Sequence, residues 1–514
     1  MKRKWMVFIS GLLATVSLLG LAGATQPAVA QQSQARSSIP FAPISIVDFG
    51  PVQTNAFFPG WTGISGDWIG YATQTVICGH CGYGVNTLNL YNAITGQKIM
   101  IRPAVERGQT TTEYRKSAEN MQLNGGILTW TQPGKPAQGS GAQYTPGDHD
   151  CTLCYYDANT GQGGAWTGGS LPPVDPKGDW SVQVGAGPPP DNSSTITVTQ
   201  QSTNKVVIRE MMKDGWQVQN PVVGRDKIVF VQTKIGHSVP QLLQLQWLLQ
   251  PDPAFQQVWA RADQPVAAGK AARSWLWGPA PIVTAREQYV EGVGGTRLVQ
   301  YYDKSRMEVN NPAADPDNPA YVTNGLLAVE MVSGEIQIGD LATVKATIPC
   351  TIPVAGDPRK DNPLTPSYSD FMGVATLHGE NQETSRVGEK VDDSIDVNGA
   401  TGKDTARANL SKYAAFVPET SHNVPDLFWK YLTGMKATYG FDWTFVLGYP
   451  ITEAYWTKMR VSGEEMPVLV QIYQRRALTY VPDFPATWRI QQGNVGQHYL
   501  EWRTLNMMRR LLGP

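Results

Sequence analysis

The stretches that decide the fold are Thr87–Gly96, which reads TLNLYNAITG, and Thr152–Gly161, which reads TLCYYDANTG. The two align without a gap. In each, an alternating polar and apolar run ends in a polar turn closed by glycine, which is the pattern of a strand entering a hairpin. A short apolar run behind a turn precedes each of them, at Gly66–Tyr71 and at Asn124–Trp130. We therefore expect a repeated antiparallel β unit.

Weaker copies of the pattern continue beyond these two units. They pair Gly178–Val182 with Thr195–Val198, Gly224–Val231 with Leu242–Gln246, Ile282–Thr284 with Arg297–Asp303, and Gly325–Val329 with Glu335–Ile338. About six units at a spacing of roughly 30–50 residues predict a mainly β chain with a six-bladed β-propeller over residues 40–355, because radial repetition leaves only short sheet edges. Two stacked β-sandwiches are the alternative.

The first two units resemble the β-propellers of TolB-like and related bacterial sensor domains. Those propellers combine a G-x-W/L-x-Y/V strand with an L-Y-D-x-x-T-G hairpin, and the resemblance is looser in the later units. It implies a propeller fold. Because propellers serve both as enzymes and as binding platforms, the fold by itself implies no function.

Composition narrows the class of protein. The chain has 514 residues, of which 41% are hydrophobic and 17% are charged. That apolar content suits large cores and excludes a disordered chain. There are 42 Lys and Arg against 43 Asp and Glu, so the charge argues against a nucleic-acid binder that works by bulk positive charge. Abundant Gly and Trp with few charges favour β structure and an extracellular setting.

The first thirty residues predict export. Lys2–Lys4 is basic, an apolar stretch follows to about Ala24, and Ala28–Ala30 is a small-x-small cleavage site. This is the pattern of a cleaved secretory signal peptide over residues 1–30. An uncleaved membrane anchor is the alternative, since about 20 apolar residues span a bilayer. No other stretch is as long and apolar, so we expect an extracellular or envelope-associated protein without an integral membrane segment after cleavage.

Two Cys-x-x-Cys pairs lie in the first two units. With the histidine before the second pair, they form a candidate disulfide or metal set: Cys78, Cys81, His149, Cys151 and Cys154. In an oxidising compartment the pairs favour disulfides that join the two units. A structural zinc ion is the alternative, because thiolates and imidazole at such spacings suit it. No other cofactor is expected, and Cys350 is interpreted as a buried thiol.

The repeat pattern ends at residues 356–364, a Pro- and Asp-rich stretch that we interpret as a linker. Residues 365–514 then predict a smaller α+β module. Val424–Leu432 predicts an amphipathic helix with Pro in its first turn. Val468–Tyr473 predicts a strand by its alternation, and Ala406–Phe416 is compatible with a helix.

Three motifs give this module a specific resemblance. They are GYPITEAYW at Gly448–Trp456, VLVQIYQRRALTYVP at Val468–Pro482 and GNVGQHYLEWR at Gly493–Arg503. They resemble the C-terminal module of many secreted proteins of Chloroflexota-type bacteria, whose biochemical role is unsettled. A more distant likeness to the Gly-x-Pro repeats of actinobacterial wall-associated proteins implies association with the cell envelope.

One departure from that module concerns its paired arginines. The module carries Phe-Glu before Arg-Arg, whereas this chain has Tyr473 and Gln474 before Arg475 and Arg476. The acidic residue beside the arginines is lost, which puts any ion pair made there in doubt.

The aromatic residues of the module supply candidate binding residues. Most are expected in the core, but some can stack on sugar rings inside a polar rim. With the arginines and one histidine, the candidate binding set is Trp443, Tyr449, Tyr455, Trp456, Arg475, Arg476, His498 and Trp502. His498 has a side chain suited to a general base, but no spacing ties it to a nucleophile. We therefore assign no catalytic residue.

The sequence leads to a secreted, non-enzymatic cell-envelope or extracellular-matrix protein. The propeller is then an interaction platform and the C-terminal module docks to a cell-surface polymer or an extracellular protein. No nucleophile elbow, metalloprotease helix or phosphate loop is present in the sequence, which favours this hypothesis. The alternative is an extracellular hydrolase or lyase acting on polysaccharide or peptide at the propeller mouth. A zinc- or redox-responsive sensor built on the four paired cysteines is a third hypothesis.

Overall fold

The computed structural model describes residues 43–51, 58–78, 83–102, 118–131, 153–167, 170–175, 178–187, 193–234, 240–249 and 252–512. The predicted signal peptide lies outside these residues. The described chain is mainly β, as predicted, with 40% strand and 16% helix. Of its helices, none combines the length and the apolar character that crossing a membrane requires.

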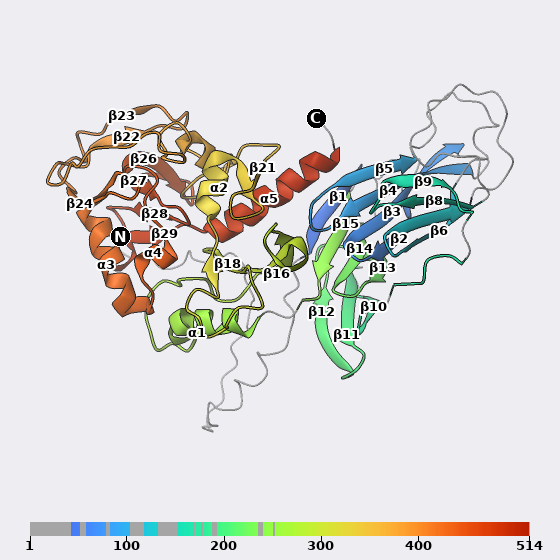
Figure 1. Ribbon diagram of the computed structural model, residues 1–514. Helices are drawn as coiled ribbons and strands as arrows, with labels where there is room; N and C mark the ends of the chain where they lie inside the picture. The colour runs from blue at the N-terminus through green and yellow to red at the C-terminus, as the bar shows by residue number, and fades with distance from the viewer. Residues whose placement is uncertain are drawn as a thin grey trace. The chain divides into compact units, whose positions relative to one another are not determined.

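Four antiparallel sheets follow one another before residue 250 (Figure 1). The first three are β2 (Phe58–Ser65), β3 (Trp68–Cys78), β4 (Tyr83–Asn92) and β5 (Lys98–Arg102); β6 (Glu119–Asn124), β7 (Ile127–Thr131), β8 (Leu153–Asp157) and β9 (Gln162–Ala165); and β10 (Trp180–Ala186), β11 (Ser194–Gln200) and β12 (Lys205–Met211). The fourth is β13 (Trp216–Val223), β14 (Lys227–Lys234), β15 (Pro240–Trp247) and β1 (Ile44–Pro51). Because β1 pairs with β15, the first described strand completes the last of the four sheets.

One backbone hydrogen bond recurs in all four sheets. In each sheet, the residue just after one strand donates its N–H to the backbone carbonyl of the residue just before the preceding strand. The pairs of consecutive strands are β3 and β4, β7 and β8, β10 and β11, and β14 and β15. The four bonds, of 2.7–3.0 Å, are Ala93 to Asp67, Ala158 to Gly126, Gln201 to Asp179 and Leu248 to Asp226. The predicted polar turns are also present, since Asn92 accepts from the N–H of Ile94 and Asp157 from that of Asn159. The four units are therefore structural repeats.

The prediction of six units is confirmed only in part. Contacts link β6 to β2, β2 to β13 and β13 to β10, and the described sheets are open, so a six-bladed propeller is not shown. The fifth predicted unit is a separate sheet of β16 (Val283–Gln288), β17 (Thr296–Tyr301), β18 (Arg306–Val309) and β19 (Thr323–Asn324).

The sixth predicted unit is wrong in its first strand. Gly325–Val329 leads into the helix α2 (Leu327–Ser333), which Gly334 ends in a left-handed conformation with a φ of 70°. Leu, Ala, Glu and Met dominate this stretch and favour helix over strand. The second half, β20 (Glu335–Gln337), pairs with β21 (Thr343–Lys345) instead.

The remaining chain forms an α+β region around a six-stranded sheet. The order of that sheet is β23 (Thr401–Lys403), β22 (Asp393–Ile395), β26 (Tyr455–Val461), β27 (Glu464–Ile472), β28 (Ala477–Tyr480) and β29 (Ile490–Gln492). A hairpin of β24 (Tyr413–Val417) and β25 (His422–Pro425) lies apart from it in the hydrogen-bond pattern. The helices are α1 (Pro253–Ala267), α3 (Asp426–Tyr439), α4 (Trp443–Val446) and α5 (Val495–Leu512).

These helices and strands can be compared with the elements predicted for residues 365–514. The helix predicted at Val424–Leu432 is α3, and the strand predicted at Val468–Tyr473 is the end of β27. The helix considered for Ala406–Phe416 is wrong, because β24 and turns occupy that stretch. Three β-branched or aromatic residues, Tyr413, Phe416 and Val417, suit the strand that forms there.

The stretch interpreted as a linker, 356–364, is docked on strand β26. The N–H of Asp357 donates to the carbonyl of Arg460 at 2.7 Å, and the Asn362 side chain accepts from the N–H of Arg460 at 2.9 Å. Asn362 is fully buried. One hydrophobic core also contains residues from both sides of this stretch, including Leu243 and Val470.

A buried lysine ties the first and fourth repeats. Lys227 is 1% exposed, and its Nζ donates to the carbonyl of Gly66 at 2.8 Å and to the Asp226 carboxylate. The ammonium also lies 5.0 Å from the ring centroid of Trp247. The turn of one repeat is thus held by the first residue of a strand in another.

Replacing this lysine should destabilise the fold. In Lys227→Met the partly buried carboxylate of Asp226 keeps, among the described residues, only Arg286, 3.6 Å away, as a counter-charge. We expect the free energy of unfolding to fall by roughly 2–3 kcal/mol in urea titrations. Lys234→Met at the other end of β14, where a partly exposed lysine lies near Trp216, is the control and should lose less than about 1 kcal/mol. Equal losses in both variants would contradict the role assigned to Lys227.

Candidate functional site

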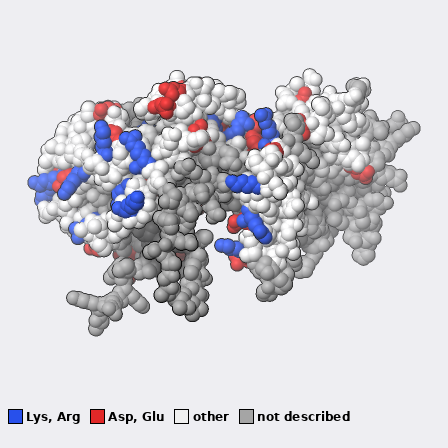
Figure 2. All heavy atoms as spheres, turned by 90° about the horizontal axis from the view of Figure 1, so that it is seen from below, with Lys and Arg blue, Asp and Glu red and all other residues white. Residues whose placement is uncertain are grey.

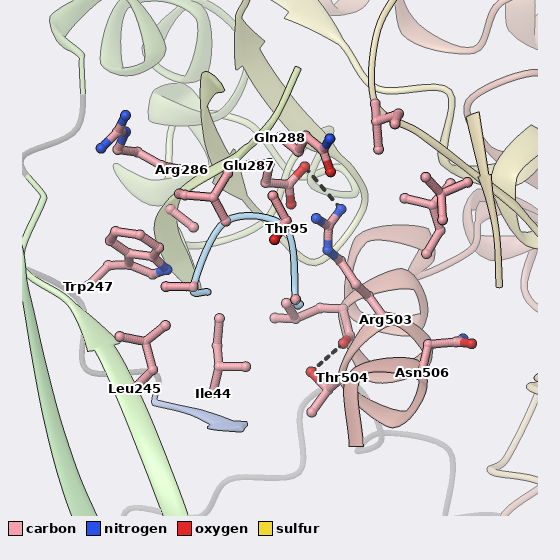
Figure 3. A pocket seen from close by; sticks show the side chains of 18 of the residues that line it. Ile44, Thr95, Leu245, Trp247, Arg286, Glu287, Gln288, Arg503, Thr504 and Asn506 are labelled. Carbon is pink, nitrogen blue, oxygen red and sulfur yellow. Dashed lines mark hydrogen bonds and ion pairs between the residues drawn. The ribbon is translucent and has the colours of Figure 1, made fainter. Parts of the chain in front are cut away.

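A pocket opens where β1, β15, β16, α5 and the turn at 93–96 meet (Figure 3). Its lining is mixed, with the apolar residues Ile44, Leu245 and Trp247 on one side and Leu500 also among the lining residues. Its polar end is formed by Glu287 and Arg503. The centre of a water molecule can move through about 90 Å³ of this space. An apolar cavity with a few convergent polar groups is the usual form of a small-molecule site.

Glu287 at the polar end belongs to a buried ion network. Its Oε2 lies 3.1 Å from Arg503, 3.2 Å from Arg306 and 3.6 Å from Arg297, and the Tyr301 hydroxyl donates to its Oε1. Glu308 and Glu330 complete the network. Three guanidinium groups thus face three carboxylates, and the network as a whole is neutral.

This network fixes the charge of its carboxylates. Burial alone raises the pKa of Glu287, but the arginines Arg306, Arg503 and Arg297 outweigh it and lower the pKa to about 2. Burial also opposes ionisation of Glu308, and Arg297 and Arg306 again lower its pKa. A general acid or base works best when its pKa is near the working pH. These carboxylates stay ionised at neutral pH and are therefore unsuited to proton transfer.

A second buried polar group looks like a catalytic triad but has the wrong proton arrangement. His422 Nε2 lies 2.9 Å from the Thr376 hydroxyl, and its Nδ1 lies 3.2 Å from Glu453 Oε1. The Thr376 hydroxyl donates its proton to the carbonyl of Glu380 at 2.7 Å. The hydroxyl proton is thus engaged by a backbone carbonyl and does not point to His422, as activation of a nucleophile by a histidine base requires. The group is a structural link between β25 and the loop at 376–380.

The predicted binding residues divide between the surface and the interior. Trp443 and Tyr449 are half-buried, and together with Trp429 they form an aromatic surface on α3, α4 and the turn after α4. The ring centroids of Trp443 and Trp429 are 6.0 Å apart, and those of Trp443 and Tyr449 are 5.9 Å apart. We call these three residues the aromatic surface.

The other predicted aromatic residues are buried and serve packing. Trp456 donates to the carbonyl of Val391 at 2.9 Å, and Trp502 to that of Ile348 at 3.0 Å. Tyr455 is 9% exposed. The structure does not bring these residues to the aromatic surface.

The two arginines are held by carbonyl oxygens. Arg475 Nε donates to Asn324 and its Nη1 to Thr444, each at 2.8 Å, so backbone carbonyls replace the missing acidic partner. Arg476 is fully buried, with its guanidinium 5.0 Å from the ring centroid of Trp277. Arg475 therefore braces the turn that carries Tyr449, whereas Arg476 belongs to the core.

Little of the cysteine set falls within the described residues. The side chain of Cys154 is fully buried in β8, and Cys350 is a buried free thiol, as expected. The side chains of Cys78, Cys81, His149 and Cys151 lie outside the described residues. The choice between disulfides and zinc stays a prediction.

Sequence reasoning missed the ion network and His422. A signal for part of the network exists, because Glu287 and Arg297 are directly opposite each other in the register of β16 and β17. By the alternation of a strand, Glu287 in VTAREQ shares a face with Val283 and Ala285, and Arg297 in TRLVQY shares a face with Val299, which is unusual for charges on an exposed strand. Nothing in the sequence joins that pair to Glu330 or Arg503, which come from helices far along the chain.

His498 gives a test of the packing around α5. Its Nδ1 lies 3.1 Å from the buried Tyr368 hydroxyl, and burial, with Lys304 nearby, lowers its pKa to about 4. A histidine whose folded pKa lies below its unfolded value of about 6.5 favours the fold at high pH. That stability is complete above pH 6.5 and is lost as the pH falls toward 4.

We expect the wild-type chain to lose roughly 2 kcal/mol of unfolding free energy relative to His498→Gln between pH 7 and pH 4. Urea unfolding of both proteins at pH 7, 5.5 and 4 measures the difference. Parallel stability curves for the two proteins would show that His498 is not held neutral by its surroundings.

Comparisons with known proteins do not assign this chain to a family. No protein-family model and no curated protein matches the chain. Three of the similar solved structures are an acylaminoacyl peptidase of Pyrococcus horikoshii, the β-propeller domain of the trilobed protease of Pyrococcus furiosus, and an ulvan lyase of a polysaccharide lyase family. Their identities are 11%, 10% and 11%, and the TM-score is 0.15 for each.

The coverage of these three structures differs. The matches cover 50%, 86% and 55% of this chain, and 38%, 96% and 73% of the respective structures. At this TM-score they carry no argument about fold or activity.

Proposed function

We propose that the protein is an exported, non-enzymatic binding protein of the cell envelope, whose C-terminal region docks to a surface polysaccharide through the aromatic surface. One observation carries this proposal: Trp443 contacts both Trp429 and Tyr449, and all three rings are only partly buried. Indole and phenol rings offer flat apolar faces with a polar tip, which suits the apolar faces of sugar rings.

The tilt of the rings favours one kind of polymer. The ring of Trp443 is inclined by 70° to that of Trp429 and by 80° to that of Tyr449. Rings so inclined do not stack together on one flat surface. Each ring contacts a different sugar unit, so a flexible or twisted glycan chain fits better than a crystalline one.

Charge supports a neutral or weakly charged glycan over a polyanion. Basic and acidic side chains lie next to one another on the described part of the face in Figure 2, with no broad basic track. The formal net charge of −1 agrees with this. Binding that depends on phosphate or sulfate groups would need a basic patch.

The hydrolase alternative has less support among the described residues. Glu287 and Glu308 stay ionised at neutral pH, and the hydroxyl proton of Thr376 is engaged by the carbonyl of Glu380 rather than by His422. Export is proposed because of the predicted signal peptide. Disulfides between the first two repeats would suit an oxidising compartment.

Truncating the central ring tests the proposal. Trp443→Ala removes the ring that touches both others, and we expect its affinity for isolated cell-wall polysaccharide to fall at least 10-fold in a sedimentation assay. Trp488→Ala is the matched control, because Trp488 is also partly exposed, at 37%, but lies outside the aromatic surface. Its affinity should stay within about twofold of wild type.

Circular dichroism keeps the test clear of folding effects, since both variants should retain the wild-type spectrum. Wild-type binding that Trp443→Ala leaves intact would refute the role of the aromatic surface. A wild-type protein that does not sediment with the polysaccharide would refute the proposed function itself.

A further inference from the structure

The pocket of Figure 3 contains an arginine whose donors are only half used. Arg503 contacts Glu287 at 3.1 Å and the Tyr499 hydroxyl at 3.3 Å, and both contacts use Nη1. Within the described residues, neither Nε nor Nη2 of Arg503 has a protein acceptor. The Arg503 side chain is 17% exposed, whereas those of Arg297 and Arg306 are fully enclosed. Arg503 is therefore the arginine of the network that reaches into the pocket.

The charge around Arg503 suits an anion. Glu287 is shared among three guanidinium groups, and the six-residue network is neutral. A second cation beside Glu287 would compete with three arginines, whereas an anion on Arg503 meets no uncompensated carboxylate. Arg286, the other arginine of the pocket, is already engaged by Asp67 at 3.5 Å and Asp226 at 3.6 Å.

The rest of the pocket suits an apolar chain. Figure 3 places Trp247, Leu245 and Ile44 across the pocket from Arg503. A space of about 90 Å³ for water centres holds several waters, since one water needs roughly 10–15 Å³ by the same measure. That room fits a ligand on the order of ten non-hydrogen atoms.

We propose that this pocket binds an aliphatic monocarboxylate. The carboxylate accepts two parallel hydrogen bonds from Nε and Nη2 of Arg503, the bidentate arrangement that a guanidinium provides. The chain lies along Trp247 and Leu245. This site is separate from the aromatic surface, so it does not depend on polysaccharide binding.

Calorimetric titration of the full mature chain with sodium octanoate tests the proposal. We expect one site per chain with a dissociation constant of about 1 mM or tighter. 1-Octanol and octylamine have the same alkyl chain length with a neutral or a cationic head group. Each should bind at least 10-fold more weakly than octanoate, because Arg503 hydrogen-bonds to the carboxylate.

A pocket-filling variant locates the site without disturbing the ion network. Thr95 is an exposed residue at the pocket, and Thr95→Trp should weaken octanoate binding at least 10-fold by occupying the space. The repeat supplies the matched control, since Thr160 stands at the same place in the second unit and is also exposed. Thr160→Trp should bind octanoate within about twofold of wild type.

Three outcomes would overturn the proposal. They are no saturable octanoate binding, equal binding of octanoate and 1-octanol, and full octanoate binding by Thr95→Trp. None of them bears on the sedimentation assay with polysaccharide, so the two proposals fail separately.

Discussion

The guanidinium of Arg306 makes the contact on which this structure depends. It lies 3.2 Å from Glu287, 2.6 Å from Glu308 and 3.2 Å from Glu330, and its side chain is fully enclosed. Burying a charged group costs free energy unless a group of opposite charge is paired with it. Burial of Arg306 therefore requires the carboxylates, and burial of the carboxylates requires Arg306. The ion pairs therefore favour the arrangement of β16–β18 and α2 that brings these groups together.

The same network decides what the neighbouring pocket can do. Arginines that hold a carboxylate ionised remove it from acid–base chemistry, and they leave one guanidinium, that of Arg503, facing the cavity. The pocket is thereby suited to holding a ligand rather than transforming one. We propose two separate binding properties of one chain, one at the pocket and one at the aromatic surface.

The repeats were predictable because each depends on neighbouring residues. TLNLYNAITG and TLCYYDANTG predict a strand and its turn, and the structure has both, with Asn92 and Asp157 in the turn positions. The number of repeats was not predictable in this way. Gly325–Val329 matches the pattern of a strand, yet its last three residues begin α2, whose Leu, Ala, Glu and Met residues favour helix and whose Leu327 and Met331 are buried.

The candidate sites show the same division. The sequence pointed to Trp443 and Tyr449 because aromatic residues are conspicuous, but only burial separates them from Trp456 and Trp502, which are packed in the core. The ion network joins β16, β17, β18, α2 and α5. Its members are spread from Glu287 to Arg503, and no local spacing marks residues that meet only in the folded chain.

The most direct measurement is the unfolding free energy of Arg306→Met, compared with Lys403→Met. Lys403 pairs with Asp392 and Asp393 at 2.8 and 2.7 Å but is 53% exposed, so its loss should cost less than about 1 kcal/mol. Arg306→Met leaves three buried carboxylates with two arginines and should cost roughly 3–5 kcal/mol in urea titrations at neutral pH. A loss no larger than that of Lys403→Met would contradict the claim that the buried network holds this part of the fold together.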